Sequence, residues 1–180
     1  YGYIVGGDYG GPRPSKTSNS QRVDYASDSS TASPKGKITD TGYSISGVGD
    51  NNFGYSVGGQ RPGISSKVDR LDYSNDTAAA VAKGPLSSAR RYVGATGNAS
   101  YGYWMGGADS TTSPPARSIV DRIDYSNDTP TASPKGNLSS AKRCVTNNGF
   151  GSRTNTLYQE QKFLIPATRS EANSLPRGTN

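Results

Sequence analysis

Histidine is absent from this chain of 180 residues, and cysteine, methionine and tryptophan each occur only once. Without histidine the chain lacks the usual general base of enzymes and the commonest metal ligand. A single cysteine, Cys144, cannot form an intrachain disulfide, and no imidazole is present to activate its thiol. No apolar run approaches the roughly 18 residues that a membrane-spanning helix needs. The composition therefore predicts no catalytic residues, no metal site and no cofactor.

Large aliphatic residues are also scarce. Leu, Ile, Val and Phe together number 25 of 180, which is below the level of roughly 20% at which disorder becomes a concern. The net charge of +6 is modest, however, and 12 tyrosines and 23 glycines indicate short strands, tight turns and a core in which tyrosine supplies much of the buried area. The 20 basic residues are scattered singly or in pairs, so we expect no nucleic-acid partner.

One phrase occurs three times, as "YGYIVGG" from Tyr1, "FGYSVGG" from Phe53 and "YGYWMGG" from Tyr101. A longer phrase, "RVDYASDSSTASPKGKI" from Arg22, recurs in altered form from Arg70 and Arg122, with periods of 48 and 52 residues. We therefore divide the chain into repeats 1–53, 54–100 and 101–151, followed by a tail at 152–180 without the repeat. The chain has no initiator methionine and begins in phase with the repeat, so we expect a piece of a longer protein.

Each repeat is predicted to form four short strands and no helix longer than a turn or two. A short apolar strand ends at the glycine pair, and "IVDRIDYS" alternates between two faces. "SNDT" is typical of a turn, "TASPKG" of a third strand, and "RRYVGATG" of a fourth. Such a four-stranded unit buries too little surface alone and has to stack on its neighbours. The fold class is therefore all-β.

The difference in period lies in the segment after each glycine pair, at 8–19, 60–67 and 108–119. These segments share almost no sequence, whereas the frame around them is kept. In repeat architectures such loops emerge on one face, which is often the binding face. The loops supply six candidate ligand-binding residues: Tyr9, Arg13, Lys16, Arg61, Asp109 and Arg117.

A seventh candidate, Trp104, shares its repeat position with Ile4 and Ser56. A position that accepts Ile, Ser or Trp is under weak packing constraint, so we expect Trp104 to be exposed and able to stack on a ligand. The neighbouring position holds tyrosine three times, and these tyrosines either pack between repeats or form a platform for sugars: Tyr3, Tyr55 and Tyr103.

Acidic residues recur with the frame rather than marking one unique site. The groups Asp72/Asn75/Asp76 and Asp121/Asp124/Asn127/Asp128 bind calcium or form Asx turns, and no loop has the spacing D-x-D-x-D-G. Arg22, Arg70 and Arg122 each share a strand face with the aspartate two residues later, and these pairs are expected to form ion networks between neighbouring repeats.

The repeat resembles the kelch repeat in its glycine pairs, in the tyrosines that follow the variable loops, and in the basic pairs Arg90-Arg91 and Lys142-Arg143. It departs from that family in lacking a tryptophan after the tyrosine, and in having Gly42 and Tyr43 where an arginine is expected. The whole phrase also resembles tandem kelch-like proteins of marine phages and other environmental viruses. The resemblance covers residues 1–149.

The resemblance implies a β-propeller of four-stranded blades. Three blades do not close a ring, so further repeats or other copies of the chain are expected to complete it. The tail at 152–180 is expected to cap or anchor the array, and a degenerate fourth blade is the alternative. The resemblance also implies an extracellular or virion-surface location of the tail-fibre type.

Three functions are compatible with these features. The first is a non-enzymatic binding module for host attachment that contacts a cell-surface glycan or protein through the variable loops. The second is an architectural filament or virion subunit without a small ligand. The third is a glycan-processing enzyme on a propeller; the copper oxidases of the kelch-like family would require imidazole, which this chain does not contain.

Overall fold

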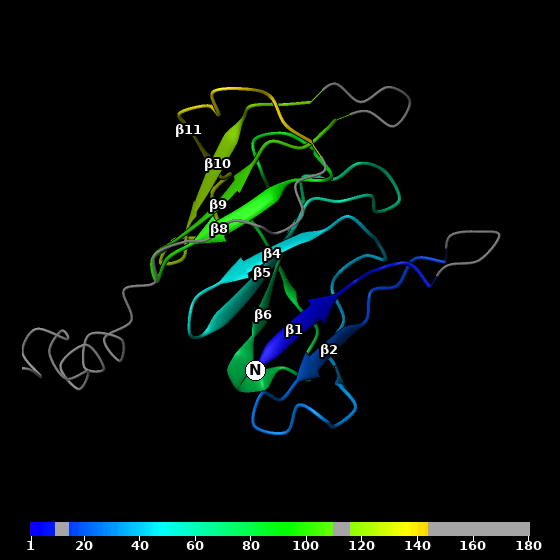
Figure 1. Cartoon of the computed structure of the whole chain (residues 1–180). Helices are drawn as coiled ribbons and strands as arrows, with labels where there is room; N and C mark the ends of the chain where they lie inside the picture. The colour runs from blue at the N-terminus through cyan, green and yellow to red at the C-terminus, as the bar shows by residue number, and fades with distance from the viewer. Residues whose placement is uncertain (10–14, 110–115, 144–180) are drawn as a thin grey trace, which may run out of the picture.

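The computed structural model describes residues 1–9, 15–109 and 116–143, which form three antiparallel sheets (Figure 1). Sheet 1 contains β1 (Gly2–Val5), β2 (Ser20–Val23) and β3 (Ser33–Lys35). Sheet 2 contains β4 (Ser46–Gly49), β5 (Phe53–Val57), β6 (Val68–Asp72) and β7 (Val81–Lys83), with a 3-10 turn, η1 (Tyr73–Asn75). Sheet 3 contains β8 (Gly94–Gly97), β9 (Tyr101–Met105), β10 (Val120–Asp124) and β11 (Ser133–Lys135).

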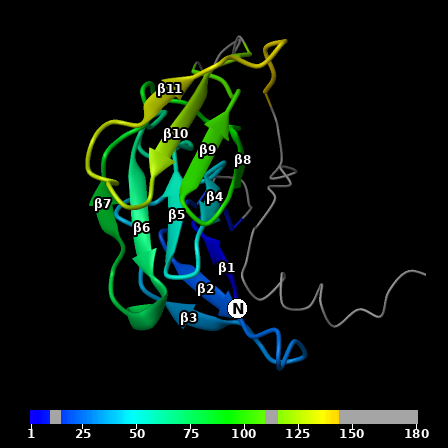
Figure 2. The ribbon, with the colours of Figure 1, turned by 90° about the vertical axis from the view of Figure 1, so that its left-hand side faces the viewer.

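The all-β prediction is confirmed. Among the described residues, the only helical element is η1, which has three residues. Within each sheet every strand pairs with the next one along the chain, and sheet 2 lies between sheets 1 and 3 in both ribbon views (Figures 1 and 2). Sheets 2 and 3 have the four strands that the repeat predicts, whereas sheet 1 has three within the described residues.

The sheets are out of phase with the sequence repeats by one strand. The segment predicted as the fourth strand of each repeat pairs instead with the following repeat, as β4 with β5 and β8 with β9. Asn98 sets this register, because its side-chain oxygen accepts from the backbone N–H groups of Ser100 and Tyr101 and so closes a tight hairpin. Asp50 does the same before β5. The "YGYxxGG" strand is therefore flanked on both sides in sheets 2 and 3, so it is not an edge strand of either sheet.

The glycine pairs recur because both residues adopt backbone angles that other residues rarely adopt. Gly58 and Gly59 have φ of 65° and 90°, and the pairs 6–7 and 106–107 also have two positive φ values. The N–H of Gly58 extends the β5–β6 pairing to the carbonyl of Lys67, at 2.9 Å. The N–H of Gly59 points the other way and donates to the carbonyl of Arg90, also at 2.9 Å. The first two pairs therefore tie their own sheets to the segments that lead into the next sheets, and Gly107 donates equivalently to Lys142 at 2.8 Å.

The main core lies between sheets 2 and 3. Val57 and Tyr55 of β5 and Val68 of β6 are almost completely buried, and they belong to one apolar cluster with Trp104 and Ile123 of sheet 3. Tyrosine contributes a large part of this core, as the composition predicted. Burial of this apolar surface is the main favourable term that holds neighbouring sheets together.

Polar contacts from one sheet hold an aspartate of the next sheet, and we call this arrangement a clamp. In the first clamp, Asp76 of sheet 2 accepts from the Tyr3 hydroxyl and from Arg22, each at 2.8 Å, and its other oxygen is 3.0 Å from Lys35 Nζ. The second clamp repeats this geometry on Asp128 of sheet 3, with partners from β5, β6 and β7: Tyr55 and Arg70, each at 2.9 Å, and Lys83 at 3.0 Å. The predicted ion pairing between neighbouring repeats is present for Arg22 and Arg70.

The clamps change the ionisation of their members. Burial by itself raises the pKa of Asp128, but hydrogen bonds from Lys83 and Tyr55 and the charge of Arg70 lower that pKa below its ordinary value. The pKa of Asp76 is lowered by the equivalent group of Tyr3, Lys35 and Arg22. Burial and the hydrogen bond to Asp128 raise the pKa of the Tyr55 phenol. The clamps therefore require charged aspartates and neutral tyrosines.

Acid is expected to destabilise the fold through these aspartates. A carboxyl whose pKa is lower in the folded state stabilises that state above its unfolded pKa of about 3.9, and this stabilisation is lost as the pH falls through the folded value. We expect the free energy of unfolding, measured by urea denaturation, to decrease from pH 5 towards pH 2.5. Asp128→Asn should reduce this slope; an equal slope in the variant would contradict the assignment.

A fully buried ion pair also crosses the boundary between sheets 2 and 3. Arg90, which precedes β8, reaches Asp121 of β10 at 2.5 Å, and both side chains are 0% exposed. Its guanidinium also donates to the carbonyls of Gly106 and Ile119. Burial lowers the pKa of Arg90, and the charge of Asp121 opposes that effect. Arg90 thereby connects the segment after sheet 2 to two strands of sheet 3.

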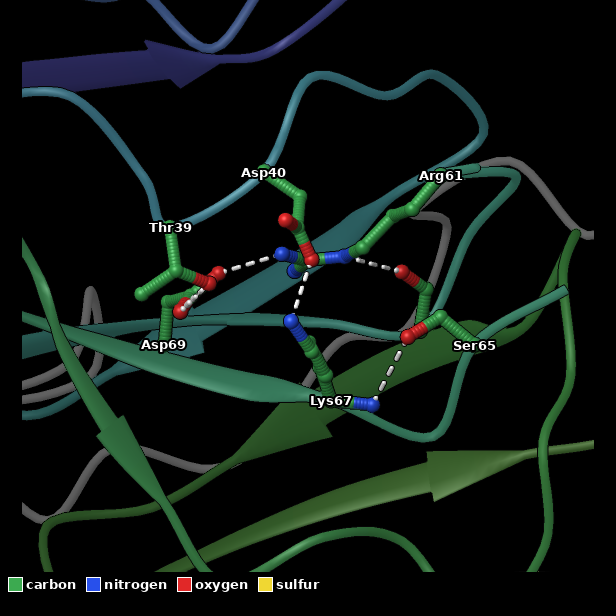
Figure 3. A network of polar contacts seen from close by, with 7 residues as sticks. Thr39, Asp40, Arg61, Ser65, Lys67 and Asp69 are labelled. Atoms are coloured by element: carbon green, nitrogen blue, oxygen red, sulfur yellow. Dashed lines mark hydrogen bonds and ion pairs between the residues drawn. The ribbon is translucent and has the colours of Figure 1, made fainter. Parts of the chain in front are cut away.

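Gly42 has the repeat position of Arg90 in the first repeat, so the first repeat has no arginine there. Arg61 takes the place of this missing side chain, and its ion pair is drawn in Figure 3. A Cβ atom added to Gly42 would lie 2.9 Å from Arg61 Cγ, so the arginine stem lies directly over the glycine. The Arg61 guanidinium pairs with Asp69 at 2.6 Å, and Thr39 donates to the same carboxylate at 2.7 Å. An arginine from the loop of the following repeat thus replaces the missing one.

Candidate ligand-binding loops

The segments that follow the glycine pairs leave the three sheets at one common end, on the right-hand side of Figure 1. Each begins with an isolated bridge just after the pair, and the three bridges are equivalent: Asp8 with Lys16, Gln60 with Ile64, and Ala108 with Ala116. The described parts of the loops agree with the prediction that 8–19, 60–67 and 108–119 share a face. This end of the molecule combines a fixed base with variable sequence.

Tyr9 is the most exposed aromatic side chain at this end, with a relative exposure of 69%. Its hydroxyl donates to Thr17 Oγ1 at 3.3 Å and accepts from Asn19 Nδ2 at 3.0 Å. The side chain of Thr17 is itself held by the backbone N–H of Asn19, at 3.0 Å. An aromatic face beside a hydroxyl and an amide can stack on an apolar surface and hydrogen-bond to hydroxyl groups at the same time. Thr17 and Asn19 were not among the predicted site residues.

Lys16 connects the first loop to the second. Its ammonium donates to the backbone carbonyl of Arg61 and lies 5.4 Å from the centre of the Tyr43 ring. Lys16 is therefore partly buried and serves to hold the two loops together, and it pairs with Asp8 in the bridge at the base of the first loop.

The side chain of Arg61 is buried. It was predicted to contact a ligand from an exposed loop, but its side chain is 1% exposed and pairs with Asp69. The predicted exposure of Arg61 is wrong, because this arginine substitutes for the one that Gly42 replaces. The nearby Lys67, which is exposed, pairs with Asp40 at 2.5 Å (Figure 3).

In the third loop, Asp109 and Arg117 form an ion pair between partly exposed side chains. Their charged groups lie at the surface, as predicted, and they hold the two described ends of this loop together. Arg13 lies outside the described residues. Tyr9, Asp109 and Arg117 are thus the predicted site residues with surface side chains.

Trp104 was expected to be exposed, and that prediction is wrong because the ring is 0% exposed. It lies over Gly102 of its own strand, where an added Cβ would come within 2.5 Å of the ring, and it belongs to the core between sheets 2 and 3. Ile4, at the equivalent position in sheet 1, is 65% exposed and does not belong to this core. Exposure at this repeat position depends on the neighbouring sheet and not on the residue type.

The aspartates that were considered as calcium ligands each bond to different partners within the protein. Asp72 and Asp124 accept from the N–H and hydroxyl of the serine two residues later, which is the Asx turn, and these bonds lower the pKa of both carboxyls. Asp76 and Asp128 are held in the clamps. No group of three or more His, Cys, Asp or Glu side chains within the described residues is arranged to hold a metal ion.

A groove of about 370 Å³ lies between sheets 1 and 2, where sheet 1 has no described counterpart of β4 and β8. Ile4, Ile45, Val48 and Leu71 contribute to its lining. None of the seven predicted ligand-binding residues lines this groove. The groove and the loop end are therefore separate features.

A scan of the sequence against models of known protein families finds no match, and a search among curated proteins also finds none. In the described part of the chain, no helix has the length and apolar character required to cross a membrane.

Proposed function

We propose that this chain is a non-enzymatic binding module, built of kelch-like propeller blades, that contacts a glycan or a protein through its variable loops. The observation that carries the proposal is the placement of three loops of unrelated sequence at one end of three sheets whose strand pattern repeats closely. A fixed scaffold with variable loops at one end is the usual arrangement of recognition proteins. The resemblance to virus-borne kelch-like proteins supports an extracellular or virion-surface setting of the tail-fibre type.

A glycan is the ligand class that the Tyr9 group favours. The exposed ring offers an apolar face, and Thr17 and Asn19 place a hydroxyl and an amide beside it. Sugars present apolar C–H faces edged by hydroxyl groups, so this combination matches their chemistry. Most of the described aspartates are engaged in clamps, turns and ion pairs, which supports a binding role in preference to hydrolysis, since hydrolysis needs two free carboxylates in a cleft.

Binding can be tested on an array of cell-surface glycans. We expect the chain to bind one class of glycan, and Tyr9→Ala to weaken that binding on the order of tenfold or more, because loss of one stacking and hydrogen-bonding anchor typically costs 1–2 kcal/mol or more. Tyr1→Ala is the matched control, since Tyr1 is 64% exposed but lies immediately before β1 and not in one of the variable loops.

Two results would count against this function. Equal binding by Tyr9→Ala and the wild-type chain would remove the first loop from the site. Absence of binding to every glycan, and to protein extracts of host cells, would favour the architectural alternative, in which the repeats only assemble.

A further inference from the structure

The two sheet-to-sheet boundaries use the same set of contacts beyond the clamps. Tyr3 stacks on Tyr73 with ring centres 5.0 Å apart, and Tyr55 stacks on Tyr125 at 4.9 Å. The N–H of Gly36 donates to the carbonyl of Asp76 at 2.8 Å, and Gly84 donates equivalently to Asp128 at 2.9 Å. Each boundary thus joins a donor half on the earlier sheet to an acceptor half on the later sheet.

Sheet 3 carries a third donor half, which we call the socket: Tyr103, Arg122, Lys135 and Gly136. No described residue hydrogen-bonds or ion-pairs with the Tyr103 hydroxyl or the Lys135 ammonium, and Lys135 is exposed. A Cβ added to Gly136 would meet no described atom within 4 Å, whereas at Gly84 it would lie 1.9 Å from a carbonyl oxygen of the next sheet. The socket is therefore open.

The arginine of the socket has the same position as the arginines of the two clamps. The Arg122 guanidinium lies 4.3 Å from the centre of the Tyr101 ring. In the two clamps the equivalent distances are 4.2 Å, for Arg22 over Tyr1 and Arg70 over Phe53. The arginine of the socket therefore needs no rearrangement to accept a carboxylate.

Sheet 1 carries the matching acceptor half, which we call the plug: Tyr25 and Asp28. Asp28 has the repeat position of Asp76 and is exposed, and Tyr25 is 70% exposed. The turn that carries them is formed as in the other repeats, since Asp24 accepts from the N–H of Ala26 at 2.9 Å. Tyr25 also lies over Gly2, where an added Cβ would be 2.5 Å from its hydroxyl.

We propose that the plug of one copy of this chain docks into the socket of a second copy. Asp28 would then be held by Tyr103, Arg122 and Lys135, and Tyr25 would stack on Tyr103. The socket is cationic and the plug anionic, so the charges are complementary. Residues 144–180 contain no aspartate and no copy of the "DYxxD" phrase, so a second copy is the occupant that the sequence supports.

Such an association is head-to-tail, because two different faces meet. It produces a ring if the rotation between copies closes, and an open filament if it does not. The proposal concerns assembly and does not depend on the loops binding a ligand.

The full chain can be tested by light scattering at about 100 µM, a concentration at which an interface with a micromolar Kd is largely occupied. We expect the wild-type chain to be larger than a monomer. Asp28→Asn should weaken association on the order of 30-fold or more, as expected for truncation of one partner of a hydrogen-bonded charge pair. Gly136→Ala should abolish association, because the methyl group would occupy the space for the second copy. It should not lower the melting temperature at a dilution at which the wild-type chain is monomeric, because the methyl group meets no described residue. Matched controls are Asp109→Asn and Gly63→Ala, the latter also at an open glycine.

Mixing the two variants separates this arrangement from others. Asp28→Asn retains the socket and Gly136→Ala retains the plug. At about 5 µM a micromolar interface is still largely occupied and one weakened 30-fold is not, so each variant alone should be largely monomeric, whereas the mixture should form a 1:1 heterodimer that grows no further. A monomeric wild-type chain would overturn the proposal. That is also the result expected if residues 144–180 of the same chain occupied the socket. Unchanged association of either variant, or a mixture that stays monomeric, would overturn it as well.

Discussion

Replacing Asp121 by alanine is expected to lower the free energy of unfolding by about 3–5 kcal/mol, the usual effect of leaving one member of a buried ion pair without its partner. Arg90 would keep its two carbonyl acceptors but would lose the carboxylate 2.5 Å away, at a site where both side chains are fully buried. Urea denaturation followed by circular dichroism measures the change directly.

The chain contains its own control for this experiment. Asp109 and Arg117 form an ion pair of similar geometry at the surface, and such exposed pairs contribute about 0–1 kcal/mol. We expect Asp109→Ala to be close to neutral and Asp69→Ala to resemble Asp121→Ala. If Asp121→Ala costs no more than Asp109→Ala, the buried pair does not stabilise the boundary between sheets 2 and 3.

Gly84→Ala is expected to destabilise the fold by about 3 kcal/mol, at the upper end of the range for overpacked sites. The added methyl group would lie 1.9 Å from the carbonyl oxygen of Pro130, and backbone atoms cannot move aside as the end of a flexible side chain can. Sheets 2 and 3 would have to separate, which would also break the hydrogen bond from Gly84 to Asp128. The melting temperature measures the loss.

Gly136→Ala is the matched comparison, because Gly136 stands at the same repeat position and a Cβ added there meets no atom of the described part of the chain. It should leave the melting temperature of the single chain unchanged. Similar losses in the two variants would show that the glycine serves the local turn rather than the contact between sheets.

The positions of the strands followed from the sequence because their causes are local. Alternation along "VDRID", glycine pairs at positive φ and Asx turns at Asp72 and Asp124 each depend on a few consecutive residues. The phase of the sheets was also readable, since Asp50 and Asn98 mark tight hairpins, but the glycine pair was the more conspicuous boundary and gave a frame displaced by one strand.

The roles of individual side chains, by contrast, depended on contacts between sheets. Ile4 and Trp104 share one repeat position, yet one is exposed and the other buried, because only Trp104 has a sheet packed over it. In the sequence, Arg61 looked like any arginine of an exposed loop. Its side chain is buried because Gly42 has no side chain, which leaves room for the Arg61 stem, and because its guanidinium pairs with Asp69. The sequence by itself determined the repeated strands and the variable loops, since these arise from short-range conformational preferences. Only the tertiary structure decided which aspartates are clamped and which faces stay open, because those outcomes depend on residues about 50 to 70 positions apart in the chain.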